Sequence, residues 1–190
     1  GQGAGFLDAP VGGSVNPARE GKLLIIVGGD ADDFARAKPV LQDLGRRVEY
    51  CGPTGGGSIM KLAVNLPLLV YWQSLAEAMV LGEAAGVDPA RTLDILRDTS
   101  GANRVVEQRI PNILKGVAGE EIPSPNTSVS AGAKDTQMMI DTLRSLGANA
   151  PVVEAAGRCF DACAAAGYGE ADGTMAIAWH FLENSRKRNK

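Results

Sequence analysis

Hydrophobic and polar positions along the chain change their period near residue 55. Before that point, short apolar runs separated by turns are typical of β-strands, and they occupy Phe6–Val11, Leu23–Val27 and Val48–Cys51. Between the last two runs, Asp32–Leu44 has a helical period. The first 54 residues are therefore predicted to be the end of an α/β unit.

After the glycines Gly55–Gly57 the pattern becomes helical. Ser58–Ala85 is rich in Ala, Leu, Val and Met and has no glycine before Gly82, which predicts one long helix. Apolar residues occur on nearly all of its sides, so other helices or a second subunit should cover it. Pro67 lacks a backbone N–H, and we expect a kink just after Asn65.

The remainder of the chain is predicted to be helical, with one long loop at Gly119–Ser130 that leads toward Lys134 and Asp135. The predicted helices are Asp88–Asp98, Asn103–Leu114, Ala133–Leu146, Pro151–Ala166 and Asp172–Asn184. The pattern thus divides the chain into an α/β part, residues 1–54, and an all-helical part, residues 55–190.

Composition narrows the class of protein. A chain of 190 residues with 45% hydrophobic and 22% charged residues can bury a core, which excludes a disordered or fibrous protein. The formal net charge is -3, so we expect no general attraction to nucleic acid or to an anionic membrane. The apolar stretch Leu62–Leu81 is interrupted by polar residues and resembles a buried helix more than a membrane span. A cytoplasmic protein fits these facts.

The cysteines predict neither disulfides nor a metal site. Cys51, Cys159 and Cys163 are too few for a disulfide scaffold, and Cys159 and Cys163 lie one helical turn apart without the other ligands of a zinc site. We interpret all three as reduced core residues.

Lys61 and Asn65 carry the strongest chemical signal. Residues four apart lie on one face of a helix, so an ammonium and a carboxamide group point to one spot. The neighbours of Lys61 are apolar, and desolvation would disfavour its ammonium form, which makes Lys61 a candidate general acid/base. The alternative that spacing alone leaves open is a surface lysine beside an N-capping loop.

Ser58-x-x-Lys61 also matches the serine–lysine pair of β-lactamase-like enzymes. No Lys-Thr-Gly or Ser-Asp-Asn motif follows, and capping of a helix would explain the serine. The nucleophile interpretation is therefore the weaker one.

Two further groups of residues could bind a ligand. Asp8–Ser14 places Gly12, Gly13 and Ser14 at the end of a strand, where backbone N–H groups and a hydroxyl can bind a carboxylate. Lys134 and Asp135 stand at the predicted start of a helix, where a charged pair is usually a solvated cap.

Together these segments resemble the β-hydroxyacid dehydrogenase family, which includes 3-hydroxyisobutyrate dehydrogenase and tartronate semialdehyde reductase. The resemblance runs over essentially all of residues 6–184, and the segments that carry it, in order, are Asp8–Ser14, Gly21–Gly29, Gly52–Asn65, Lys134–Asp135 and Tyr168–Asp172. It implies that residues 1–54 are the last strands of a Rossmann-like NAD(P)-binding domain. Residues 55–190 would then be an all-α domain of the 6-phosphogluconate dehydrogenase C-terminal type.

The resemblance also implies an activity, the interconversion of a small β-hydroxyacid and its semialdehyde with NAD or NADP. Lys61 would be the general acid/base, Asn65 with Gly12, Gly13 and Ser14 would bind substrate, and Lys134 with Asp135 would contact the cofactor. The Gly-x-Gly-x-x-Gly turn and the residue that selects NAD or NADP do not occur in this sequence. We therefore expect the chain alone to be inactive and to bind the cofactor weakly.

Two alternatives belong to other classes. One is a helical oligomerisation module that keeps the shape without the chemistry, and the other is a relative of the imine reductases. Lys61, Asn65 and Lys134 together favour the dehydrogenase, since a module has no need of a lysine in an apolar helix. The apolar circumference of the long helix predicts a homodimer or a higher homo-oligomer.

Overall fold

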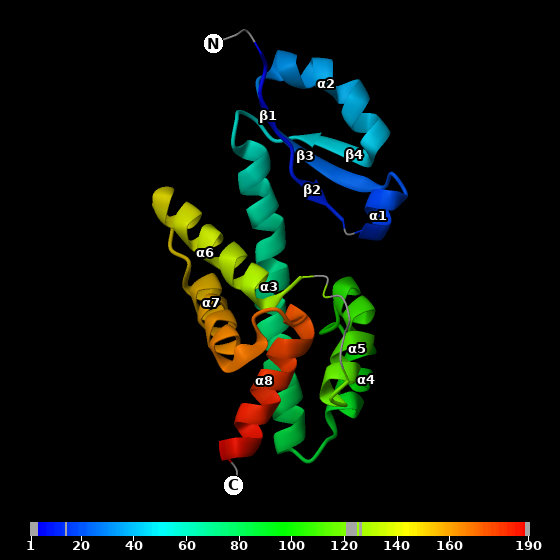
Figure 1. The fold of residues 1–190 in the computed structure, drawn as a ribbon, viewed down its shortest axis with the longest axis vertical. Helices are drawn as coiled ribbons and strands as arrows, with labels where there is room; N and C mark the ends of the chain where they lie inside the picture. The colour runs from blue at the N-terminus through cyan, green and yellow to red at the C-terminus, as the bar shows by residue number, and fades with distance from the viewer. Residues whose placement is uncertain (1–3, 14, 121–124, 126, 189–190) are drawn as a thin grey trace. The chain divides into compact units, whose positions relative to one another are not determined.

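The computed structural model describes residues 4–13, 15–120, 125 and 127–188, and the chain forms two compact units, residues 1–65 and 66–190. Helix α3, Gly56–Ala84, begins in the first unit and continues into the second (Figure 1). The predicted fold class is confirmed, because a small remnant of a Rossmann-like sheet is followed by elements that are all helices in the described part of the chain.

The first unit is built around strand β3, Leu23–Gly29, whose last five residues are buried. Strand β4, Gly45–Tyr50, lies parallel to it, and helix α2, Ala31–Leu44, connects the two (Figure 1). Parallel strands need such a crossover connection. The β4 strand begins three residues before the predicted Val48 because it pairs with β3 from Leu23 onward.

The first predicted strand is wrong as a single element. It is two short strands, β1 (Leu7–Asp8) and β2 (Val11–Gly12), and both pair antiparallel with β3. The register is the same for both pairs, and the amide of Ile26 donates to the carbonyl of Pro10 between them. Since proline has no N–H to donate, the ladder is interrupted there without a change of register. A short helix that the sequence did not predict, α1 (Val15–Arg19), follows.

The regular elements described in the second unit are all helices. After α3 its helices are α4 (Pro89–Arg97), α5 (Arg104–Val117), α6 (Val129–Ser145), α7 (Pro151–Cys163) with a π-helical turn (Ala164–Tyr168), and α8 (Gly173–Arg188). Helix α6 packs along α7, and α5 packs along α8 (Figure 1). Their core contains Met79, Ile113, Phe160 and Leu182, all fully buried.

Two predicted helix ends are wrong by four residues. Helix α6 begins at Val129 with Ser128 as its N-cap, four residues before the predicted Ala133, because the Ser128 hydroxyl accepts from the amide of Ala131. Helix α8 continues to Arg188 instead of ending at Asn184. Its Arg186 guanidinium lies 2.7 Å from the Glu83 carboxylate, which holds the last turn against α3.

Helix α3 is long and apolar enough to cross a membrane by length and composition, a test that the core helix of a soluble protein also passes. Within the second unit, Leu69, Trp72, Leu75 and Met79 of α3 are buried against the surrounding helices. This part of α3 is the predicted buried helix, and it forms the centre of the helical unit.

Candidate active site

The segment that follows β1 supplies the predicted substrate-binding glycines. Gly12 is the last residue of β2 and pairs with Leu24, and Gly13 follows it with φ +123°. A side chain at position 13 would be strained by this backbone conformation and would meet Pro17 and Leu23 at 3.1 Å. The structure thus requires glycine at this strand end. Ser14, the third predicted substrate contact, lies outside the described residues.

The first turn of α3 packs directly on the backbone of β3. A Cβ atom at Gly57 would lie 2.7 Å from the carbonyl oxygens of Asp8 and Ile26 and 2.8 Å from the nitrogen of Gly28. A Cβ at Gly28 would meet the nitrogen of Gly57 at 2.6 Å. Because neither residue has a side chain, the helix and the strand approach each other backbone to backbone.

Asp8 completes this junction, although the sequence indicated no role for its side chain. One carboxylate oxygen accepts from the amide of Gly55 and the other from the amide of Ser58, each at 2.7 Å. Burial alone would raise the pKa of the Asp8 carboxyl, but hydrogen bonds from Gly55 and from both the amide and the hydroxyl of Ser58 outweigh it and lower that pKa. A residue of β1 therefore caps α3.

The capping role predicted for Ser58 is consequently wrong. Helix α3 begins at Gly56, so Ser58 lies within its first turn, and the hydroxyl of Ser58 hydrogen-bonds to Asp8. This bond also gives the serine a structural explanation that needs no nucleophile.

Lys61 and Asn65 both lie on α3 within the first unit, one helical turn apart and both half-buried. The structure therefore places the two predicted side chains on one face of the helix that starts at the Asp8 junction. The expected apolar shell is wrong for this chain, because Ile59, Met60 and Val64 are each more than 40% exposed.

Lys134 and Asp135 lie in the second unit, in the second turn of α6 and not at its start. The Lys134 side chain is exposed and forms no ion pair with any other residue that the structure describes. Asp135 is half-buried. An exposed ammonium group without a carboxylate partner can bind an anionic or carbonyl group of a cofactor.

The start of α6 is held by the segment before α8. The amide of Val129 donates to the carbonyl of Ala171, and the amide of Gly173 donates to the carbonyl of Thr127. Asp172 in turn caps α8 and faces Arg109 of α5. Sequence reasoning missed Arg109, since its distance from Asp172 along the chain leaves no local signal.

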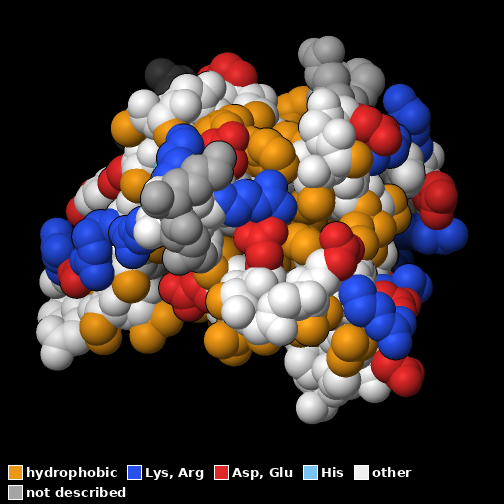
Figure 2. Space-filling model, turned by 90° about the horizontal axis from the view of Figure 1, so that it is seen from below, with side chains coloured by type: hydrophobic (Ala, Val, Ile, Leu, Met, Phe, Trp, Pro, Cys, Tyr) orange, Lys and Arg blue, Asp and Glu red, His pale blue; other side chains and the backbone are white. Residues whose placement is uncertain are grey.

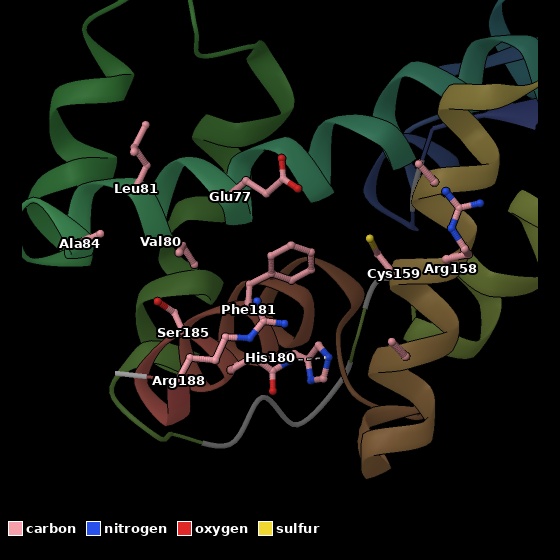
Figure 3. A pocket seen from close by; sticks show the side chains of 13 residues that line it. Glu77, Val80, Leu81, Ala84, Arg158, Cys159, His180, Phe181, Ser185 and Arg188 are labelled. Atoms are coloured by element: carbon pink, nitrogen blue, oxygen red, sulfur yellow. Dashed lines mark hydrogen bonds between the residues drawn. The ribbon is translucent and has the colours of Figure 1, made fainter. Parts of the chain in front are cut away.

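A pocket of ≈ 770 Å³ lies between α3, α7 and α8 in the second unit, and none of the predicted site residues lines it. Figure 3 shows Glu77 and Val80 on α3, Cys159 on α7 and His180 on α8 around it. Cys163, one turn beyond Cys159, is fully buried, and burial raises the pKa of its thiol to about 12. Among the described residues no group of three or more His, Cys, Asp or Glu side chains could hold a metal ion.

Two family models match the chain. Residues 55–180 match the model described as the NAD-binding domain of NADP-dependent 3-hydroxyisobutyrate dehydrogenase. Residues 1–52 match the NAD binding domain of 6-phosphogluconate dehydrogenase.

Relatives and solved structures agree with these models. The chain is 36% identical to a 3-hydroxyisobutyrate dehydrogenase of Pseudomonas aeruginosa over 81% of this chain and 50% of that protein. It is 33% identical to the L-threonate dehydrogenase of Cupriavidus necator over 93% of this chain and 58% of that protein. The crystal structure of a 3-hydroxyisobutyrate dehydrogenase from Salmonella typhimurium is similar with a TM-score of 0.78 at 30% identity, over 91% of this chain and 59% of that one. The chain thus spans about half the length of the relatives it matches.

Proposed function

Because the chain belongs to the β-hydroxyacid dehydrogenase family, we propose that it carries the substrate side of an NAD(P)-dependent oxidoreductase that interconverts a small β-hydroxyacid and its semialdehyde. One observation carries the proposal. Lys61 and Asn65 lie on one face of the helix whose first turn is joined to the glycine-bearing strand end through Asp8.

Lys61 is the proposed general acid/base. As an ammonium group it gives a proton to the aldehyde oxygen during reduction, and as a free amine it takes the hydroxyl proton during oxidation. Asn65 would hold the same oxygen or the neighbouring carboxylate by hydrogen bonds. Gly12, Gly13 and Ser14 would bind the substrate carboxylate through backbone N–H groups and a hydroxyl.

Lys134 is the proposed contact to the cofactor, and Asp135, the next residue of α6, is the second proposed cofactor-binding residue. The exposed, ion-pair-free side chain of Lys134 within the described part of the chain fits this role. NAD or NADP, when bound, supplies or accepts the hydride. The residue that selects between the two does not occur in this sequence.

A substitution at Lys61 tests the function. Lys61→Ala in the full-length enzyme that contains this chain should lower kcat for the oxidation of 3-hydroxyisobutyrate by about 10²–10⁴-fold, the usual contribution of general acid–base catalysis. The dissociation constant of the cofactor, measured by fluorescence titration, should stay unchanged. Lys38→Ala, which removes a lysine from α2 in the same unit, is the matched control and should leave kcat unchanged. Full activity of Lys61→Ala would remove Lys61 from the mechanism.

The substrate belongs to one chemical class with several members. The relatives carry the names 3-hydroxyisobutyrate dehydrogenase and L-threonate dehydrogenase, and both substrates are short hydroxy acids with a carboxylate. Comparing kcat/KM for 3-hydroxyisobutyrate and L-threonate with the same enzyme preparation would identify the preferred one.

A homo-oligomer is the proposed assembly. Leu81 of α3 is 74% exposed beside the pocket of the second unit, whereas Leu75 and Met79 of the same helix are buried. Figure 2 shows hydrophobic side chains exposed among Lys, Arg, Asp and Glu side chains on one face of the molecule. Light scattering should give at least the mass of a dimer, and Leu81→Lys should weaken association more than Leu44→Lys, an exposed leucine on α2.

We also propose a domain boundary and a cellular location. Division of the chain at residues 54 and 55 is supported by the family models, one of which ends at residue 52 while the other begins at residue 55. The cytoplasmic location would be tested by fractionating cells that express the full-length protein.

A further inference from the structure

The Asp8 carboxylate is the side chain that joins the strand end to the helix of Lys61. It accepts from the amides of Gly55 and Ser58 across a separation of 47 and 50 residues, and also from the hydroxyl of Ser58. The residue directly before α3 is Gly55, which has φ +93° and no side chain, so the capping acceptor does not come from that position. The amide groups at the start of a helix otherwise lack a partner within the helix.

The position of Asp8 in its strand also relates this contact to the proposed substrate-binding glycines. In β1, Asp8 pairs with Gly28 of β3. Four residues later Gly12 of β2 pairs with Leu24 of β3 in the same register. The Asp8 carboxylate thus connects two segments. One is the strand segment that ends in the proposed anchor of the substrate carboxylate, and the other is helix α3, which carries the proposed acid/base Lys61 three residues after Ser58. Both lie in the first unit.

We propose that Asp8 is a positioning residue. It fixes the first turn of α3 to the proposed substrate-binding strand end and so holds Lys61 at the distance from the substrate that proton transfer requires. The inference rests on the proposed function and deepens it. A displacement of the reacting groups by about 1 Å can cost about 10²-fold in rate. The negative charge of Asp8 at the start of the helix also favours the ammonium form of a nearby lysine.

Asp8→Asn in the full-length enzyme tests the proposal. The amide group of asparagine can accept only through its oxygen, so one of the two backbone N–H groups loses its partner while the size of the side chain is kept. We expect kcat to fall by at least about tenfold, with the dissociation constant of the cofactor unchanged. For the oxidation reaction, in which Lys61 acts as the free amine, we also expect the acidic limb of the kcat–pH profile to move to lower pH, because one negative charge is lost from the start of the helix that carries the acid/base.

Asp30→Asn is the matched control. Asp30 caps α2 in the same unit and accepts from the amides of Asp32 at 2.9 Å and Asp33 at 3.3 Å, so the same atoms are exchanged at a helix that carries no proposed site residue. It should lower stability without moving the pH profile. Asp8→Ser, which keeps a short acceptor without the charge, serves if the asparagine variant does not fold.

The outcomes separate the two proposals. Folded Asp8 variants with the same kcat and pH profile as Asp30→Asn, beside an inactive Lys61→Ala, would overturn the positioning role alone. Full activity of Lys61→Ala would overturn the proposed function and with it this inference. Faster hydrogen exchange at the amides of Gly55 and Ser58 in Asp8→Asn, read by NMR, is expected independently of activity, and unchanged exchange would contradict the capping contact.

Discussion

The Asp172 carboxylate faces the Arg109 guanidinium at 3.6 Å inside the helical unit, where the two side chains are 1% and 15% exposed. Asp172 also accepts from the amides of Thr174 and Met175. One buried carboxylate therefore pairs with α5 and caps α8.

Removing the cation should be costly. Arg109→Met is expected to lower the free energy of unfolding by about 3–5 kcal/mol, because the charge facing a buried carboxylate is lost. Urea unfolding followed by circular dichroism measures this. Arg91→Met, which removes an exposed pair with Asp94, should cost less than about 1 kcal/mol. Equal losses in the two variants would show that the buried pair contributes no more than a surface pair.

The backbone contact between α3 and β3 predicts intolerance to a single methyl group. Gly57→Ala should lower the free energy of unfolding by about 1–3 kcal/mol, because its Cβ would meet only backbone atoms, which cannot rotate away. Gly157→Ala is the control, since its Cβ would have ordinary contacts of 3.5 Å or more, and alanine is favoured in a helix by about 1 kcal/mol. A harmless Gly57→Ala would contradict the close approach.

His180 predicts a dependence of stability on pH. Burial lowers the pKa of its imidazole, as does Lys187, while Glu183 opposes them. The folded state thus prefers the neutral form, so the contribution is fully present above the ordinary pKa of 6.5 and is lost as pH falls through the lower folded value.

The test compares urea midpoints at about pH 7.5 and about pH 5.5, between which histidine changes its charge. The wild-type midpoint should fall, and His180→Gln should show a smaller fall. Because the chain has one histidine, no other imidazole contributes. An NMR titration that gives a pKa above 6.5 would contradict the prediction.

Lys134 should affect cofactor binding without affecting stability. Its side chain is exposed, so Lys134→Ala should change the free energy of unfolding by less than about 0.5 kcal/mol. In the full-length enzyme the cofactor dissociation constant should rise about tenfold, the loss of about 1.4 kcal/mol that one charged contact supplies. Lys115→Ala, an exposed lysine on α5, should leave that constant unchanged.

The change of hydrophobic period near residue 55 was enough to predict the order and kind of nearly all elements, because local periodicity determines which face of an element is buried. The start of α6 was not predictable in the same way. Thr127 and Ser128 are typical of a loop, and the Ser128 cap together with backbone pairing to Ala171 and Gly173 places the start of the helix at Val129.

In the candidate site, too, local features were predictable from the sequence and long-range contacts were not. Lys61 and Asn65 were predictable because their spacing is local to one helix. The capping role of Asp8 was not, since it depends on pairing between segments nearly fifty residues apart. The exposure of Ile59, Met60 and Val64 depends on tertiary contacts as well, and the apolar sequence alone predicted the opposite.

The remote cap of α3 also has a consequence for local unfolding. If β1 detaches from β3, the amides of Gly55 and Ser58 lose their acceptor at the same moment, so the helix start should fray together with the strand. The two segments then form one cooperative unit with a shared opening free energy. A thermal fluctuation that releases the substrate anchor would release the first turn below Lys61 as well.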